Sequence, residues 1–213
     1  QRQMCIRDSD YIDFVENEPD CLKRSLQKGH VTASCWILCP ERNEVLLTHH
    51  RKLGIWIQLG GHLDGGEDVL DAGLREAREE SGIPDIRPIS ESLLDLDIHQ
   101  IPENRKEAAH LHYDARFLFQ AGSKNFQISS ESLDLAWVPL DRLEDYSDED
   151  SILRMREKQE ILISGRSFPE NPAQTKLSKF QKPKLRLKFK PGVRNISLLN
   201  FMVRVFFDSP NQE

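Results

Sequence analysis

Hydrophobic and polar positions along the chain predict strands and helices in alternation. Residues 31–39 alternate with a period of two, which is typical of a buried strand whose odd-numbered side chains share one face, with Trp36 and Leu38 on the other. A turn at 40–43 leads into a second strand at 44–49, so these two strands should form a hairpin. Similar patterns predict further strands (94–98, 110–119 and 133–138) and helices (11–28 with a break near Pro19, 67–81, 141–146 and 151–163). Such a mixture of strands and helices indicates an α/β fold built in layers.

A glycine-rich loop is expected before the helix at 67–81. Gly60, Gly61, Gly65 and Gly66 let the backbone turn tightly into the start of that helix. The free N–H groups and the positive dipole end of a helix N-terminus favour phosphate. The loop is therefore a candidate phosphate-binding segment.

The composition is that of an ordinary globular protein. The chain has 213 residues, of which 38% are hydrophobic and 30% charged, so one domain with extensions is expected. No run approaches 18 consecutive apolar residues, and a membrane partner is therefore not expected. The four cysteines are too few and too scattered for a disulfide scaffold and favour a reducing compartment. We expect a cytoplasmic protein.

The charge is unevenly distributed. The net charge is -6, yet from Ser167 to Glu213 nine Lys and Arg residues stand against three acidic ones. The rest of the chain is therefore strongly acidic. An acidic body suits the binding of divalent metal better than the binding of nucleic acid, so a nucleic-acid partner is not expected.

Composition and charge divide the chain into three segments. Residues 1–9 resemble the translated end of a sequencing adapter and are interpreted as an artefact, so they are left out of the fold prediction. Residues 10–165 carry the globular pattern. Residues 166–213 form a basic extension, interpreted as disordered or artefactual, with an added strand or a contact to a membrane surface or nucleic acid as alternatives.

The helix at 67–81 gathers carboxylates on one side. At 100° per residue, Glu76, Glu79 and Glu80 fall within an arc of about 100°. Hard oxygen ligands on one face suit Mg²⁺ or Mn²⁺, although three glutamates alone are also typical of a solvated helix face. The neighbouring glycine loop favours the metal site, because a diphosphate needs metal ions that offset its charge and activate a water for attack at phosphorus.

The stretch 61–83 resembles the complete signature of the Nudix hydrolases. It reads GHLDGGEDVLDAGLREAREESGI: a glycine, five residues, a glutamate, seven residues, then Arg-Glu-Ala, one residue, a pair of glutamates, one residue and a closing Gly-Ile. The resemblance implies a Nudix-type α/β/α sandwich around a mixed β-sheet. It also implies metal-dependent hydrolysis of a nucleoside diphosphate linked to another group.

The resemblance further implies roles for individual residues. The Mg²⁺ or Mn²⁺ ligands would be Glu76, Glu79, Glu80 and the backbone carbonyl of Gly61. Arg75 would orient these glutamates through salt bridges, and Glu67 would brace the loop. The family draws its general base from this helix or from a distant loop, and Glu76 is the preferred candidate here. The catalytic set is thus Glu76, Arg75, Glu79 and Glu80.

A second group of residues is predicted to bind the substrate or its phosphates. His110, His112 and Asp114 alternate along a strand, so all three should point to one face. That face could supply a metal ligand, a phosphate contact or the base, and a polar stripe at an open sheet edge is the alternative. Gly60, Gly61 and Glu67 complete this candidate set.

The resemblance extends over residues 30–164. The segments 49–52, 56–62 and 109–114 are similar to a bacterial Nudix subgroup of undefined substrate. One departure is Leu59, where many relatives have a proline before the glycine pair.

Two alternatives to a small-molecule hydrolase remain at this point. A sensing module would keep the fold and lose catalysis, but no residue of the signature is lost here. An RNA-directed enzyme would use the basic extension to reach a capped 5′ end. The identity of the diphosphate substrate stays open, and so does homodimer formation.

Overall fold

The computed structural model describes residues 2–103 and 107–164, and the predicted basic extension 166–213 lies outside these ranges. The centre of the fold is a seven-stranded mixed sheet in the order β3-β2-β1-β6-β5, with β4 also paired to β1 and β7 to β2. The strands are β1 (Gly29–Leu38), β2 (Glu44–His50), β3 (Trp56–Ile57), β4 (Leu59–His62), β5 (Ile86–Ile101), β6 (His110–Ala121) and β7 (Ser132–Pro139). The helices are α1 (Arg2–Asn17), α2 (Val69–Ser81), the 3₁₀ helix η1 (Leu140–Asp145) and α3 (Asp150–Ser164). Strands β1 and β6 pair in parallel, whereas β1–β2, β1–β4 and β5–β6 are antiparallel.

Strand β1 lies at the centre of the sheet and confirms the predicted alternation. Val31 and Cys35 pack on one face against residues of α2, while Trp36 and Leu38 pack on the other face against residues of α3. All of β1 is buried, because helices cover both faces. The expected α/β/α sandwich around a mixed sheet is therefore confirmed, and so is the hairpin of β1 with β2.

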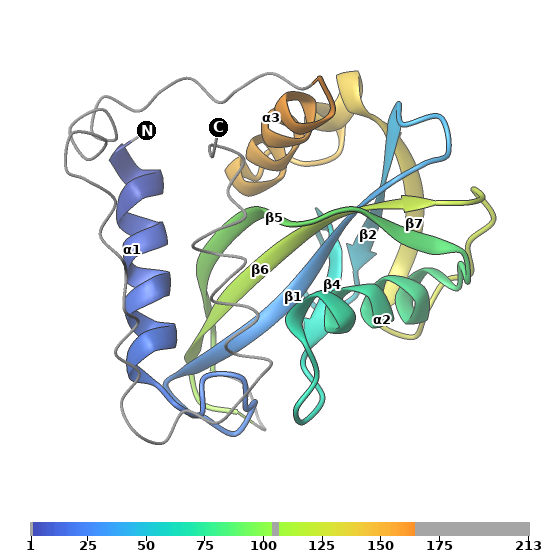
Figure 1. The fold of residues 1–213 in the computed structure, drawn as a ribbon. Coiled ribbons are helices and arrows are strands. Elements are labelled where there is room, and N and C mark those ends of the chain that lie inside the picture. The colour runs from blue at the N-terminus through green and yellow to red at the C-terminus, as the bar shows by residue number, and fades with distance from the viewer. Residues whose placement is uncertain (1, 104–106, 165–213) are drawn as a thin grey trace.

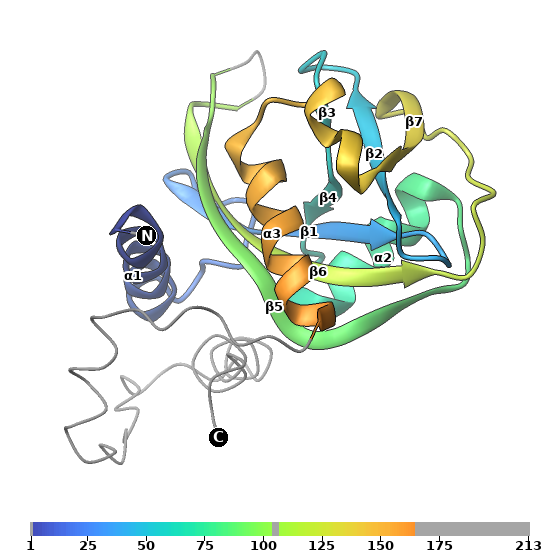
Figure 2. The ribbon, with the colours of Figure 1, turned by 90° about the horizontal axis from the view of Figure 1, so that it is seen from above.

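The helices are distributed around the sheet unequally. Figures 1 and 2 show α2 and α3 on opposite faces, with α1 beside the β5 edge. Phe14 of α1 stacks on the ring of Tyr113, with 3.6 Å between ring centroids. Among the described helices, none has the length and apolar character needed to cross a membrane.

Helix α2 begins two residues later than predicted and is capped at both ends. The carboxylate of Asp68 accepts a hydrogen bond from the Leu70 N–H at 2.9 Å, so Asp68 is the N-cap. Gly82 follows the last turn with φ 66°, a left-handed conformation that glycine adopts without strain. Glu67 therefore lies in the loop before the helix.

The glycine pair lies in a strand, which corrects the predicted loop. Gly60 and Gly61 belong to β4 and pair with Ser34 and Ala33 of β1. Gly60 has φ 155°, and a Cβ built on it would lie 2.6 Å from the Ala33 carbonyl oxygen. Gly60 is therefore needed for the close approach of β4 to β1, a role that the sequence pattern did not distinguish from turn formation.

The predicted helix at 11–28 was wrong at both ends. Helix α1 ends at Asn17, and turns follow to residue 28. The residue before a proline is disfavoured in a helix, so Pro19 ends the helix instead of breaking it. The helix also extends back to Arg2, and Arg7 lies 3.3 Å from the Asp97 carboxylate. The adapter origin of residues 1–9 stays a prediction.

Strand β5 is much longer than the predicted 94–98. Its pairing with β6 is irregular between Pro88 and Asp95, which breaks the period of two that the prediction depended on. The helix predicted at 141–146 is a 3₁₀ helix, η1. The strands predicted at 110–119 and 133–138 are confirmed as β6 and β7, and the helix predicted at 151–163 as α3.

Candidate active site

The three glutamates on α2 differ strongly in exposure. Glu79 is 60% exposed at its side chain, Glu76 is half-buried, and Glu80 is only 9% exposed. Glu80 reaches β4, where it accepts a hydrogen bond from the Gly60 N–H at 3.0 Å. The cluster therefore extends from solvent to the space between α2 and β4.

Burial and mutual repulsion raise the pKa of the two inner carboxyls. Burial raises the pKa of Glu80 to about 8, although the hydrogen bond from Gly60 favours the charged form. Burial also raises the pKa of Glu76, while the hydrogen bond from Arg75 opposes the rise. The negative charges of the other glutamates add to both shifts, and a cation among them would reverse this effect.

The absence of a side chain at Gly61 brings Glu76 against the backbone of β4. A Cβ built on Gly61 would lie 2.5 Å from the Glu76 carboxyl carbon, which no real contact allows. The glycine therefore keeps the carboxylate beside the strand. The backbone conformation of Gly61 does not itself require glycine.

We expect Gly61→Ala to lower kcat on the order of 10²-fold without unfolding the protein, because the new methyl group displaces the Glu76 carboxylate. Gly65→Ala is the matched control, since a Cβ there meets nothing within 4 Å and the residue has no positive φ. Steady-state kinetics and thermal unfolding of both variants test this. Equal kcat values for the two variants would show that the space at Gly61 is not needed.

Arg75 connects the loop to the glutamates. Its guanidinium donates to Glu76 at 2.9 Å and to Glu79 at 3.1 Å. It also donates to Glu67 and, at 2.8 Å, to the His62 carbonyl oxygen of β4. The hydrogen bond with Glu67 contributes most to raising the pKa of Arg75, so the guanidinium stays charged.

Glu67 holds the loop between β4 and α2. Besides its contact with Arg75 at 3.1 Å, its carboxylate accepts a hydrogen bond from the Asp64 N–H at 3.2 Å. The side chain is 20% exposed, so both contacts are shielded in part from water. Glu67 therefore connects the loop to the helix.

Glu131 is a further carboxylate near the cluster that the sequence did not indicate. It lies just before β7, and its negative charge contributes to the raised pKa of both Glu76 and Glu80. Its backbone carbonyl accepts a hydrogen bond from the Arg51 N–H at 3.0 Å, which holds this loop beside β2. No local pattern marks it, because only the β2–β7 pairing brings it close.

Asp114 is buried in a hydrogen-bonded network. Its carboxylate accepts from the hydroxyls of Thr32 at 3.0 Å and Ser34 at 2.8 Å, and from the Arg116 guanidinium at 2.8 Å. The side chain is 2% exposed. Asp114 therefore has the surroundings of a structural ion pair, and its assignment to substrate binding stays a prediction.

His110 and His112 share a face with Asp114, as the alternation predicts. In the register of the sheet, His112 lies beside His30 and Asp114 beside Thr32, on the face opposite α2. The structure thus brings Arg75, Glu67 and the glutamates together with β4 and places these histidines on the other side of the sheet. Their predicted contact with phosphate is untested.

Comparison with known proteins gives a match to one domain family. The profile of the NUDIX domain matches residues 28–168. The chain is also similar to the m7GpppN-mRNA hydrolase NUDT17 of Xenopus laevis, with 36% identity over 81 residues. This match covers 35% of the chain and 27% of the relative, so the chain spans about a quarter of that protein's length.

Solved structures show low similarity. An Ap4A hydrolase from C. elegans in a binary complex has 20% identity and a TM-score of 0.47, covering 63% of this chain and 98% of that one. A NUDIX family hydrolase from Clostridium perfringens has 24% identity and a TM-score of 0.47, covering 62% and 97%.

Proposed function

Because the chain belongs to the Nudix family of hydrolases, we propose that it cleaves a diphosphate linkage in a nucleoside diphosphate derivative with the help of Mg²⁺ or Mn²⁺. The observation that carries this proposal is the placement of Glu76 and Glu80 against β4, with Arg75 joining Glu76 to Glu79. Every charged residue of the motif is present and makes a hydrogen bond within the site. A catalytic site requires these residues, whereas a catalytically silent module does not.

The residues present fit a hard divalent cation. The donors would be carboxylate oxygens and the backbone carbonyl of Gly61, and oxygen donors of this kind are what Mg²⁺ and Mn²⁺ prefer. The missing side chain at Gly61 leaves Glu76 beside the strand, where a Cβ would otherwise stand. When bound, such an ion offsets phosphate charge and lowers the pKa of a coordinated water.

The surrounding residues position the donors. Arg75 holds Glu76 and Glu79 by hydrogen bonds, and Gly60 holds Glu80 through its N–H. Glu67 accepts hydrogen bonds from Arg75 and from the Asp64 N–H of the loop, and this holds Arg75 in position beside the donors. Glu131 contributes negative charge from the loop before β7. We propose these four as positioning or accessory groups and the α2 glutamates as metal ligands.

The test is product release from a panel of diphosphate compounds with Mg²⁺, Mn²⁺ or chelator alone. The panel includes nucleoside triphosphates, nucleotide sugars, Ap4A and m7GpppN-capped RNA. We expect turnover on at least one compound and none with chelator. A folded protein that binds nucleotides and turns over none of the compounds would instead be a sensing module.

A further inference from the structure

Histidines from three strands meet at one end of the sheet, on the face opposite α2. His30 is the second residue of β1, His62 ends β4, and His110 and His112 are the first and third residues of β6. The ring centroid of His30 lies 5.0 Å from that of His62, 5.1 Å from His110 and 4.9 Å from His112. The three strands therefore place imidazoles around His30.

His30 is buried without a hydrogen-bond partner. The residue is 2% exposed, and within the described residues neither of its ring nitrogens meets hydrogen-bond geometry with a partner, although the backbone of Leu26 lies close to the ring. Buried polar groups are nearly always partnered, because an unpartnered one loses its hydration without compensation. A ligand for these nitrogens is therefore expected.

One pair of ring nitrogens already has the spacing of two ligands on a metal ion, and the third lies nearby. One nitrogen from each of His30, His110 and His112 lies within 4.8 Å of the others. The Nε2 atoms of His110 and His112 are 3.3 Å apart. Two nitrogens bound tetrahedrally to Zn²⁺ at about 2.0–2.1 Å are separated by about 3.3 Å, which agrees with this distance.

The protonation of the rings also suits a metal. Nδ1 of His110 lies 2.8 Å from the Ala108 carbonyl oxygen, which places its proton there and leaves the Nε2 lone pair facing His112. A neutral imidazole of this kind binds a metal through its free ring nitrogen.

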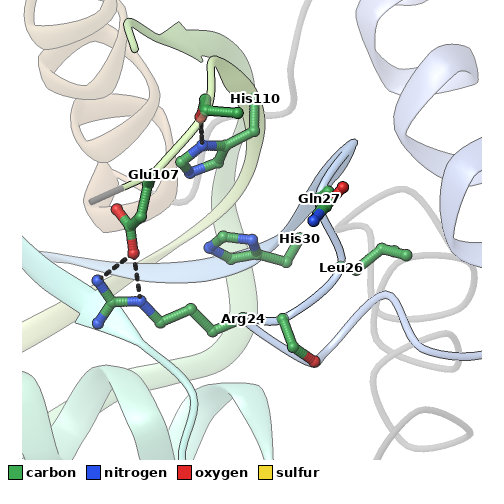
Figure 3. A pocket seen from close by; sticks show the side chains of 8 residues that line it. Arg24, Leu26, Gln27, His30, Glu107 and His110 are labelled. Atoms are coloured by element: carbon green, nitrogen blue, oxygen red, sulfur yellow. Dashed lines mark hydrogen bonds and ion pairs between the residues drawn. The ribbon is translucent and has the colours of Figure 1, made fainter. Parts of the chain in front are cut away.

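A cavity lies beside the cluster. A cavity of about 500 Å³ is lined by His30 and His110 together with Arg24 and Glu107. Figure 3 shows both rings beside the Arg24–Glu107 ion pair, whose closest atoms are 2.7 Å apart. Because Glu107 neutralises Arg24, the cavity does not present an unpaired positive charge to a cation at this point.

We propose that His30, His110 and His112 bind a transition-metal ion of the Zn²⁺ type at a site separate from the glutamates of α2. Imidazole nitrogens favour Zn²⁺ and its neighbours in the first transition row, whereas the oxygen donors of α2 favour Mg²⁺ and Mn²⁺. The two sites therefore select different ions. The cavity leaves room for a further ligand from solvent.

The experiment uses the full chain, stripped of metal by a chelator that is then removed, and titrated with Co²⁺ as a spectroscopic substitute for Zn²⁺. We expect about one equivalent to give the strong visible absorption of tetrahedral cobalt. Glu80→Gln should leave this absorption unchanged, which separates this site from the proposed catalytic one. In parallel, Zn²⁺ should raise the unfolding temperature of the wild type.

His30→Phe is the decisive variant, because phenylalanine fills the ring's place without leaving unpartnered nitrogens. Without metal it should unfold at or above the wild-type temperature. It should also bind Co²⁺ at least roughly 100-fold more weakly, since even outer partners of metal ligands alter affinity 10–100-fold. His49→Phe, a half-buried histidine on β2, is the matched control and should bind as the wild type does.

Three outcomes would overturn the proposal. They are no cobalt absorption in the wild type, equal binding by His30→Phe and the wild type, or stabilisation by inorganic phosphate in place of Zn²⁺ that His30→Phe abolishes. The last outcome would assign the cluster to an anion.

Discussion

Glu80→Gln is expected to lower kcat on the order of 10³-fold while leaving the metal-free protein at least as stable as the wild type. Glu80 is the most buried of the three glutamates, and its contact with Gly60 fixes it between α2 and β4. Glutamine has nearly the same shape, and its amide oxygen can still accept the Gly60 N–H. It removes the negative charge that a divalent cation requires and, with it, the cost of burying a carboxylate.

Asp71→Asn is the matched control for this prediction. Asp71 lies exposed in the first turn of the same helix, so its neutralisation removes one carboxylate from α2 without touching the cluster. We expect kcat to change less than about twofold. Steady-state kinetics at saturating Mg²⁺ and thermal unfolding with chelator measure both effects. If Glu80→Gln retained wild-type kcat, the donor set proposed for the metal would be wrong.

The sequence predicts the part of the site that is local along the chain. The helix period alone places Glu76, Glu79 and Glu80 on one side of α2, and Arg75 lies within reach of them for the same reason. Their unequal burial was not predicted, because it depends on β4 lying against the helix. Strand β4 itself was expected as a loop, since glycines at a turn and at a close strand contact look alike in sequence.

The pattern of hydrophobic and polar residues could not predict contacts between distant segments of the chain. Glu131 joins the glutamates only through the pairing of β7 with β2, and His30 meets His110 through the parallel pairing of β1 with β6. Parallel register depends on the whole sheet and has no marker in either strand. The alternation of His110, His112 and Asp114 gave their common face, but the partners across that face come from other strands.

A buried ion network between β5, β6 and α3 gives the largest expected effect on stability. The guanidinium of Arg116 is 2% exposed and donates to Asp114 at 2.8 Å and to Asp97 at 3.1 Å. On the α3 side, Arg154 and Lys158 contact the buried carboxylate of Asp95 at 2.7 and 2.6 Å. Removing Arg116 would leave the buried carboxylate of Asp114 without its guanidinium partner and would take one cation away from Asp97.

We expect Arg116→Met to lower the free energy of unfolding by about 3–5 kcal/mol at neutral pH, because an uncompensated buried charge is more costly than the pair it replaces. Arg142→Met should change the free energy of unfolding far less, since Arg142 pairs with Asp145 at the surface, where water screens the pair. Denaturant unfolding of both variants measures the difference. If Arg116→Met does not fold, Arg116→Lys keeps the charge and should lose less stability.

The pH dependence separates loss of charge balance from loss of packing. Burial alone would raise the pKa of Asp97, but the hydrogen bond from His99 and the charges of Arg116 and Arg154 hold it well below its ordinary value. A carboxyl with a lowered pKa stabilises the fold above its unfolded-state value of about 3.9, and this contribution is lost as the pH falls. The stability gap between the wild type and Arg116→Met should therefore narrow on acidification toward pH 3. A gap that stays constant between pH 7 and pH 3 would mean that Arg116 contributes packing and not charge balance.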